Sequence, residues 1–168
     1  VGFIRGPPMI VQILAWYLVP QAIGAPITPF VAACVGLGVN AAAFISEILR
    51  GAILAIPRGQ REAAVSYGLS TTYSIVAIEL PQAAPAIVPA MMGFFISLVK
   101  DTSLAYVVGL YELTRTGRVI ADREFQPMEV YIVIAAIYFL LCFPLSRIVK
   151  TADKRLQQRG LAQASLAV

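Results

Sequence analysis

The 168-residue sequence contains no histidine and only two cysteines, and charged residues make up just 13% of it. It also lacks a Gly-x4-Gly-Lys-Ser/Thr phosphate loop and a Gly-x-Ser-x-Gly nucleophile elbow. Cys34 and Cys142 lie inside apolar runs, so we interpret them as small packing residues and not as a disulfide or a metal pair. These absences exclude the usual route to ATP hydrolysis and argue against metal-dependent and serine-hydrolase chemistry.

Apolar residues are abundant instead: 59% of the sequence is hydrophobic and its mean hydropathy is +0.80, both outside the range of soluble proteins. Uncharged runs cover residues 6–46, 80–99 and 130–146, and a helix needs about 20 mostly apolar residues to cross a bilayer. Prolines and glycines near residue 24 divide the first run in two. We therefore expect an all-α integral membrane protein with about four spans, near residues 9–23, 30–49, 80–99 and 130–146. A soluble bundle is disfavoured, because little amphipathic surface remains to cover these runs.

Basic residues gather beside particular spans, and cytoplasmic flanks carry that excess in membrane proteins. Arg50, Arg58 and Arg61 follow the second span, whereas acidic residues outnumber basic ones between the third and the fourth. We expect both chain ends and the 50–74 loop to face the cytoplasm, against anionic lipid headgroups. The net charge of +4 then requires no nucleic-acid partner. The basic residues after the fourth span are Arg147, Lys150, Lys154, Arg155 and Arg159.

The polar segment between the second and third spans is typical of two short helices. Residues 60–67 are helix-forming, and Gly68 suits a left-handed C-terminal stop. Ser70 or Thr71 then caps a second short helix, which we expect Pro81 to end before the third span. The pattern predicts a helix-turn-helix at the cytoplasmic surface.

Within this segment, Glu62-Ala63-Ala64 is followed by Gly68, Ile78 and Leu80-Pro81. These residues and their spacing resemble the EAA loop of permease subunits in binding-protein-dependent ABC importers. The resemblance implies a helix that docks into a separate ATPase. The small side chains of the two alanines would let the backbone of the ATPase approach this helix closely. From Glu-Ala-Ala-x3-Gly alone, a capped surface helix with a glycine stop explains the pattern equally well. The coupling residues that the resemblance implies are Gly59, Gln60, Glu62, Ala63, Ala64, Gly68 and Leu69.

Four other stretches resemble the polar amino-acid branch of that family, which carries histidine, glutamate, glutamine or arginine. The resemblance implies a type I importer transmembrane domain over residues 1–160, followed by a short C-terminal tail at 161–168. Members of this type usually have five spans, so we expect the first helix to be missing from a chain that begins at Val1. Pro8, Ala52 and Pro85 depart from the pattern, and the lack of an arginine at position 85 puts the details of a typical ATPase contact in doubt. The four stretches are Arg5-Gly6-Pro7-Pro8, Glu47 with Arg50-Gly51, Pro57-Arg58-Gly59-Gln60 and Lys100-Asp101-Thr102-Ser103-Leu104.

The same resemblance implies an assembly in the bacterial plasma (inner) membrane, with the C-terminus of this chain in the cytoplasm. The partners would be two ABC ATPase subunits, an extracytoplasmic amino-acid-binding protein, and a second permease copy or a sister permease. ATP and Mg would bind to the ATPase, and this chain would bind no cofactor itself. The lipid membrane is the remaining partner.

Lys100 and Asp101 lie well inside the bilayer if the third span extends to about residue 110. Ionisable groups there are costly and mark functional sites. A zwitterionic amino acid offers a carboxylate to Lys100 and an ammonium group to Asp101, and Thr102 and Ser103 offer hydrogen bonds, so we expect these four residues to line the substrate path. The alternative is a span that ends near residue 99, with Lys100 reaching the headgroups.

Glu47 and Arg50, three residues apart on a helix, are expected to pair at the cytoplasmic end of the second span. We assign this pair and Pro81 structural roles, with gating as the alternative for the pair. Two other classes of protein remain open. A secondary transporter or channel would need no ATPase. An intramembrane enzyme would have to use the 100–103 cluster as a serine–lysine dyad, although adjacent helix positions point in different directions.

Overall fold

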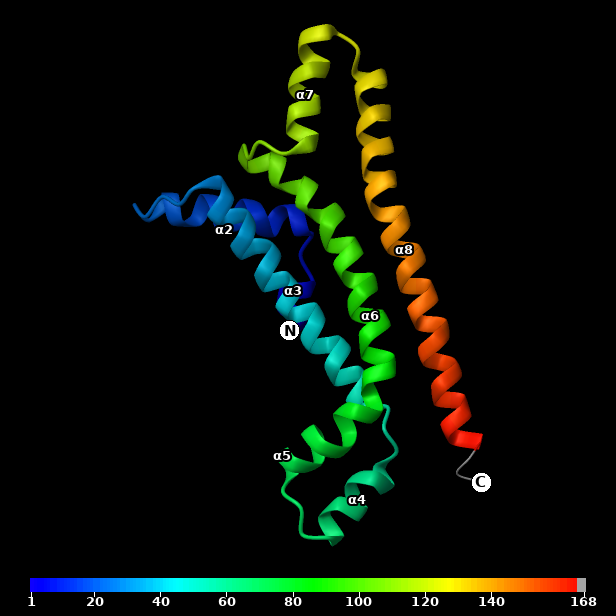
Figure 1. Ribbon diagram of the computed structural model, residues 1–168. Coiled ribbons are helices and arrows are strands. Elements are labelled where there is room, and N and C mark those ends of the chain that lie inside the picture. The colour runs from blue at the N-terminus through cyan, green and yellow to red at the C-terminus, as the bar shows by residue number, and fades with distance from the viewer. Residues whose placement is uncertain (166–168) are drawn as a thin grey trace. The chain divides into compact units, whose positions relative to one another are not determined.

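The computed structural model describes residues 1–165, and every regular element in that range is a helix, which confirms the all-α prediction (Figure 1). The described chain divides into two compact units, one of residues 1–44 with 95–146 and one of 45–94 with the residues from 147 onward. In chain order the elements are α1 (Gly2–Arg5), α2 (Met9–Ala22), α3 (Pro29–Leu54), α4 (Arg58–Ser66), α5 (Thr71–Tyr73), the π-helix η1 (Ser74–Glu79), α6 (Leu80–Asp101), the 3-10 helix η2 (Thr102–Val108), α7 (Leu113–Glu124) and α8 (Pro127–Ser165).

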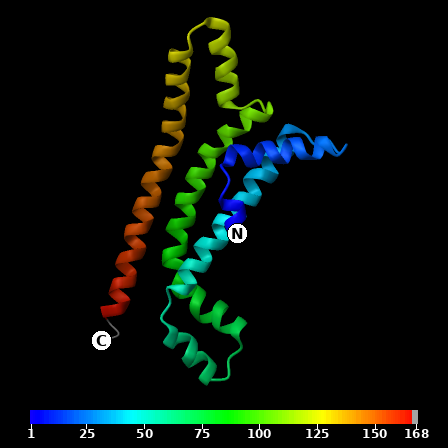
Figure 2. The same cartoon turned by 180° about the vertical axis from the view of Figure 1, so that it is seen from behind.

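Among the described residues, three helical segments are long and apolar enough to cross a membrane: Pro29–Leu54, Thr71–Val108 and Pro127–Thr151. They correspond to three of the four expected spans. The expected first span is also helical, but α2 has 14 residues, fewer than the about 20 that a full crossing takes. Helix α8 runs without a break through residues 161–165 (Figure 2), and residues 166–168 of the expected tail lie outside the described range.

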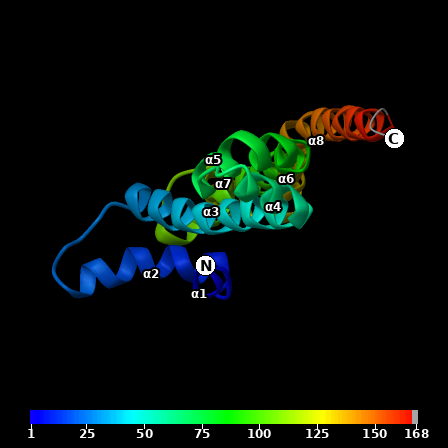
Figure 3. The same ribbon diagram turned by 90° about the horizontal axis from the view of Figure 1, so that it is seen from below.

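In the first unit, α2 is joined to α3 by the turn at residues 23–28 (Figure 3). Ile13 of α2 is completely buried, and a side chain added at Gly36 of α3 would begin 3.3 Å from its Cγ1 atom. Because Gly36 has no Cβ, the two helices pack closely at this point. Proline opens α3, since Pro29 occupies the first helical position, where a missing N–H costs nothing.

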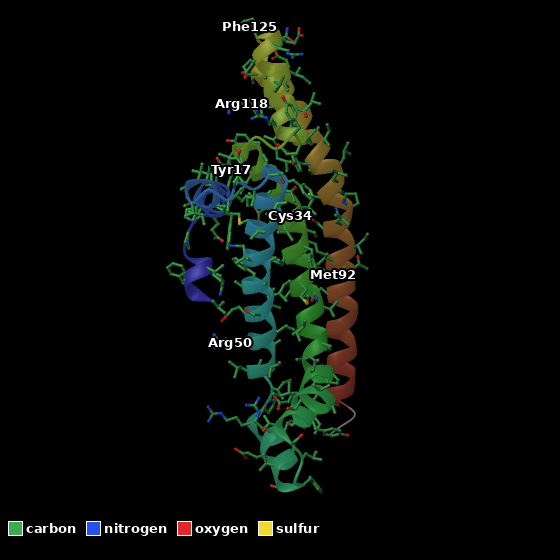
Figure 4. The ribbon with its side chains drawn as sticks, turned by 90° about the vertical axis from the view of Figure 1, so that its left-hand side faces the viewer. Tyr17, Cys34, Arg50, Met92, Arg118 and Phe125 are labelled. Atoms are coloured by element: carbon green, nitrogen blue, oxygen red, sulfur yellow. The ribbon has the colours of Figure 1, made fainter. Side chains whose placement is uncertain are left out.

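The acidic segment between the second and third long spans folds as α7, which turns back into α8 in the same unit. The Glu112 carboxylate accepts hydrogen bonds from the backbone N–H groups of Thr114 at 2.8 Å and Arg115 at 2.7 Å, and so caps α7. Phe125 ends α7 in the left-handed conformation, with a φ of 54°, and is 88% exposed at the turn into α8 (Figure 4).

In the second unit, α4 and α5 form the expected helix-turn-helix. Gly68 has a φ of +72°, and the Leu69 N–H donates to the Ala64 carbonyl at 3.1 Å, which closes α4 with a left-handed C-terminal turn. Ser70 caps α5 by accepting a hydrogen bond from the Tyr73 N–H at 3.3 Å. Both predicted signals are confirmed.

The expectation that Pro81 ends the second helix is wrong. The helical segment continues from Thr71 to Val108, and Pro81 is the second residue of α6. The Leu80 N–H donates to the Ile75 carbonyl, five residues back, so the chain reaches Pro81 with π-helical hydrogen bonding. In an ordinary α-helix each backbone N–H donates to the carbonyl four residues back, and proline has no N–H to donate. The widened turn before Pro81 explains how the helix continues through this proline.

Candidate functional site

A hollow of the second unit has a volume of about 620 Å³ and lies between the end of α3, the 55–57 turn, α4 and Glu79. Its apolar side includes Leu54 and Val65, which are 63% and 65% exposed. Arg58, Arg61, Glu62 and Glu79 supply its charges. Helix α4 therefore presents an open surface of mixed polarity.

Most of the predicted coupling residues lie together on the outside of this unit. Gly59, Gln60, Glu62 and Ala63 are exposed on α4, and Gly68 is exposed in the turn that follows, beside the half-buried Leu69. Ala64 is only 3% exposed, because it faces the rest of its own unit. Of the two alanines, only Ala63 is open to another backbone.

Glu62 carries a charge that the described part of the chain does not neutralise, since no ion pair between described residues includes it. Its backbone carbonyl accepts a hydrogen bond from the Ser66 hydroxyl at 2.9 Å, and the residue is exposed. An exposed carboxylate that belongs to no ion pair is suited to contact with a positively charged surface or with N–H donors.

Glu79 is the opposite case, a carboxylate that is only 1% exposed. Arg61 of α4 donates to it from Nε at 3.1 Å and from an Nη atom at 2.5 Å, and the Ser74 hydroxyl donates to it at 3.1 Å. The hydrogen bonds from Arg61 to Glu79 and the Glu79 charge raise the pKa of Arg61 above its already high ordinary value, so the guanidinium stays charged.

This network was not predicted from the sequence. The signal was present, because Glu79 is a single acid between apolar Ile78 and Leu80, at the edge of an uncharged run. A buried acid needs a partner, but the sequence does not identify Arg61, which lies 18 positions earlier.

The predicted Glu47–Arg50 pair is confirmed. An Nη atom of Arg50 lies 2.6 Å from a Glu47 carboxylate oxygen, and Arg50 Nε donates to the second oxygen at 3.4 Å. The Arg50 side chain is 65% exposed, so the pair contributes little to stability in water. The pair lies near the end of α3, where Figure 4 shows Arg50 on the helix surface.

The four residues predicted to line a substrate path lie in the first unit, where α6 gives way to η2. Lys100 borders a hollow of about 230 Å³ whose other walls come from α8, including Tyr138, Phe143 and Ser146. Asp101 is half-buried at the end of α6, and the Thr102 hydroxyl donates to the Val99 carbonyl at 2.7 Å. Ser103 is half-buried in η2. Lys100 is thus the member of this group that borders the hollow.

Comparison with known proteins gives a consistent result. Residues 1–158 match the family described as "Binding-protein-dependent transport system inner membrane component". The L-cystine transport system permease protein TcyB of Bacillus subtilis (strain 168) is 38% identical over 160 residues, which cover 94% of this chain and 68% of that protein. The glutamine transport system permease protein GlnP of Escherichia coli (strain K12) is 37% identical over 156 residues, covering 92% and 71%.

Two solved structures share the fold. "Crystal structure of an amino acid ABC transporter with histidines" contains a chain that superposes with a TM-score of 0.83 at 35% identity, covering 91% of this chain and 72% of that one. The MetNI methionine ABC transporter in an inward-facing conformation gives a TM-score of 0.69 at 26% identity, covering 90% and 71%.

Proposed function

Since this chain belongs to the family of binding-protein-dependent transport system inner membrane components, we propose that it is a permease subunit for the ATP-driven uptake of a polar amino acid. Relatives that carry the names of L-cystine and glutamine permeases support an amino-acid substrate. The observation that carries the coupling part of the proposal is the exposed face of α4, where Glu62 belongs to no ion pair among the described residues.

The energy for transport would come from outside the chain. The exposed coupling residues of α4 and its turn, Gly59, Gln60, Glu62, Ala63 and Gly68, would dock into a cleft of an ABC ATPase subunit that holds ATP and Mg. Each of the two permease subunits would bind one ATPase. ATP binding would draw the two docked loops together and rock the spans from an inward-facing to an outward-facing state. In this proposal α4 acts as a rigid lever, with Gly68 fixing the angle at which it leaves the chain.

The remaining partners follow from the same proposal. An extracytoplasmic binding protein would deliver the amino acid, and a second copy of this chain or a sister permease would complete the path. The chain would lie in the bacterial inner membrane with its C-terminus in the cytoplasm, where the basic residues after the last span face anionic lipid. Lys100, Asp101, Thr102 and Ser103 would line the path, with Lys100 attracting the substrate carboxylate.

The test is whether the chain purifies with an ATPase and whether Glu62 is needed for that contact. The tagged chain is purified from the bacterium that makes it, and the ATP hydrolysis of the purified material is measured. We expect the wild-type chain to copurify with an ATPase. With Glu62→Lys the copurified ATP hydrolysis should be at least about tenfold lower, because a reversed charge at a docked surface costs on the order of several kcal/mol. The control is Asp122→Lys, which reverses an exposed acid on α7 and should retain the ATPase.

A secondary transporter would give the opposite result. It would take up amino acids in vesicles that contain the purified chain and an ion gradient but no ATPase. Uptake under those conditions, or a wild-type chain that never purifies with ATP hydrolysis, would contradict the proposal.

A further inference from the structure

Glu79 is one of the two largest side chains in the described structure that are fully buried, and it is the only charged one of the two. Burying a carboxylate is costly unless the charge is paired and its oxygens accept hydrogen bonds. Both conditions are met here, because Arg61 donates two hydrogen bonds and Ser74 a third. The acid is therefore held in one position by partners from two elements.

Those partners connect α4 with η1. Arg61 lies in the first half of α4, one residue before Glu62, whereas Ser74 and Glu79 are the first and last residues of η1. Gln60, Glu62 and Ala63 on the same helix are exposed, so the inner contacts of α4 are Ala64 and this ion pair. Alanine offers a small apolar contact with little directional preference, whereas a two-pronged guanidinium–carboxylate pair fixes both distance and orientation.

The π-helical geometry of η1 determines where Glu79 points. A π turn contains about one residue more than an α turn, so a change of η1 into an α-helix would rotate Glu79 by about 100° relative to Ser74. Glu79 could then not accept hydrogen bonds from both Ser74 and Arg61 in their present positions. The ion pair and the widened turn thus stabilise each other, directly before α6 begins at Leu80.

We propose that the Arg61–Glu79 pair, with Ser74, is the mechanical link that carries the movement of α4 into η1 and the start of α6. Arg61 and Glu79 are positioning residues: their charged groups bind each other, and they keep the docked helix and the span that follows it moving as one body. Without the pair, α4 would still dock through its exposed face but would turn about Gly68 and the 55–57 loop. This inference rests on the function proposed above.

The experiment compares transport with ATP hydrolysis in the complete complex. The wild-type chain, Glu79→Gln, Arg61→Gln and the double variant are each purified with the ATPase and reconstituted into vesicles with the binding protein. Uptake of labelled amino acid is then divided by ATP hydrolysed. Glu79→Gln is the principal variant, because glutamine keeps the size and a hydrogen-bond acceptor for Ser74 and leaves the half-exposed Arg61 in contact with water.

We expect Glu79→Gln to keep the ATPase bound and its ATP hydrolysis within about twofold of wild type, while transport per ATP falls at least about tenfold. Arg61→Gln should have the same effect, and the double variant should be no worse than either single one, because all three remove one shared interaction. The matched control is Asp122→Asn, which removes the exposed Arg118–Asp122 pair on α7 and should leave transport per ATP unchanged.

Transport per ATP that stays at the wild-type level in Glu79→Gln would overturn the inference, as would additive losses in the double variant. If Glu79→Gln does not assemble with the ATPase, transport per ATP is measured in Arg61→Lys instead, because lysine keeps the positive charge but lacks the forked guanidinium. An unchanged ratio in Arg61→Lys would overturn the inference, and a reduced ratio would support it. Failure of the proposed function itself looks different, because the wild-type chain would then purify without an ATPase.

Discussion

Asn40 on α3 donates a hydrogen bond from Nδ2 to Oε1 of Gln12 on α2 across 3.3 Å, and both side chains are 9% exposed. Gln12 uses its own amide nitrogen to donate to the carbonyls of Ile4 at 2.8 Å and Pro7 at 3.0 Å. A single glutamine therefore links the N-terminal turn, α2 and α3 in the first unit. Buried amides in a membrane protein stabilise a helix contact when their hydrogen bonds are all made.

The first prediction concerns this contact. Asn40→Leu should lower the free energy of unfolding by about 1–2 kcal/mol, because the Gln12 carbonyl oxygen is left buried without its donor. Thermal unfolding of the purified chain in detergent measures the change. The matched control is Gln82→Leu, which removes an exposed amide that donates only to the Ile78 carbonyl of the same helical segment. This variant should change the free energy of unfolding little. Equal losses in the two variants would contradict the role of the Gln12–Asn40 contact.

The second prediction concerns the turn after α4. Gly68→Ala should destabilise that turn by about 1–2 kcal/mol, because a φ of +72° brings a Cβ atom too close to the following carbonyl. Hydrogen exchange at the backbone amides of Tyr67 and Leu69 should become faster. In Gly93→Ala, where the glycine is helical and no neighbouring atom lies within 4 Å of the added Cβ, we expect unchanged or slightly higher stability. Slow exchange in Gly68→Ala would show that the left-handed turn does not hold α4.

The third prediction tests the proposed substrate path. Lys100→Ala should reduce uptake at least about tenfold while the chain still assembles with its ATPase, because the loss removes a charge inside the path and no docking residue. Uptake of labelled amino acid and copurified ATP hydrolysis are measured on the same preparation. The control is Arg118→Ala, which removes a cation from the exposed face of α7. This variant should take up the amino acid at the wild-type rate. Wild-type uptake by Lys100→Ala would remove Lys100 from the path.

The fourth prediction concerns the close contact of α7 with α8. A Cβ atom at Gly117 would overlap Cδ1 of Ile134, a residue that is only 7% exposed. Gly117→Ala should therefore cost about 1–3 kcal/mol of stability through overpacking. Adding Ile134→Val removes the overlapping methyl group and should restore part of the loss, whereas Ile132→Val, at an exposed position of α8, should restore none. Thermal unfolding of the three variants distinguishes these outcomes, and equal stability in all three would contradict the contact.

Several features of this protein follow from short stretches of sequence. The long uncharged runs determine that the chain is helical and membrane-spanning, because an unpaired backbone is too costly in lipid. Gly68 and Ser70 mark the end of α4 and the start of α5, and Glu47 and Arg50 pair across one helical turn. In each case the physical cause acts within a few residues, so the residue types and their spacing are sufficient to predict the structure.

The tertiary structure alone decided the features that depend on contacts between elements. Pro81 does not end its helix, because a π turn precedes it, and no residue type marks such a turn in advance. Ala64 turns inward, so half of the small-residue pair is covered by the chain itself. Glu79 pairs with Arg61, which lies 18 positions earlier, because a buried acid is stable only beside a cation and folding places Arg61 there. The sequence by itself determined which segments form the three long apolar helices and where α4 ends, whereas only folding determined how α4 is tied to the helix that follows.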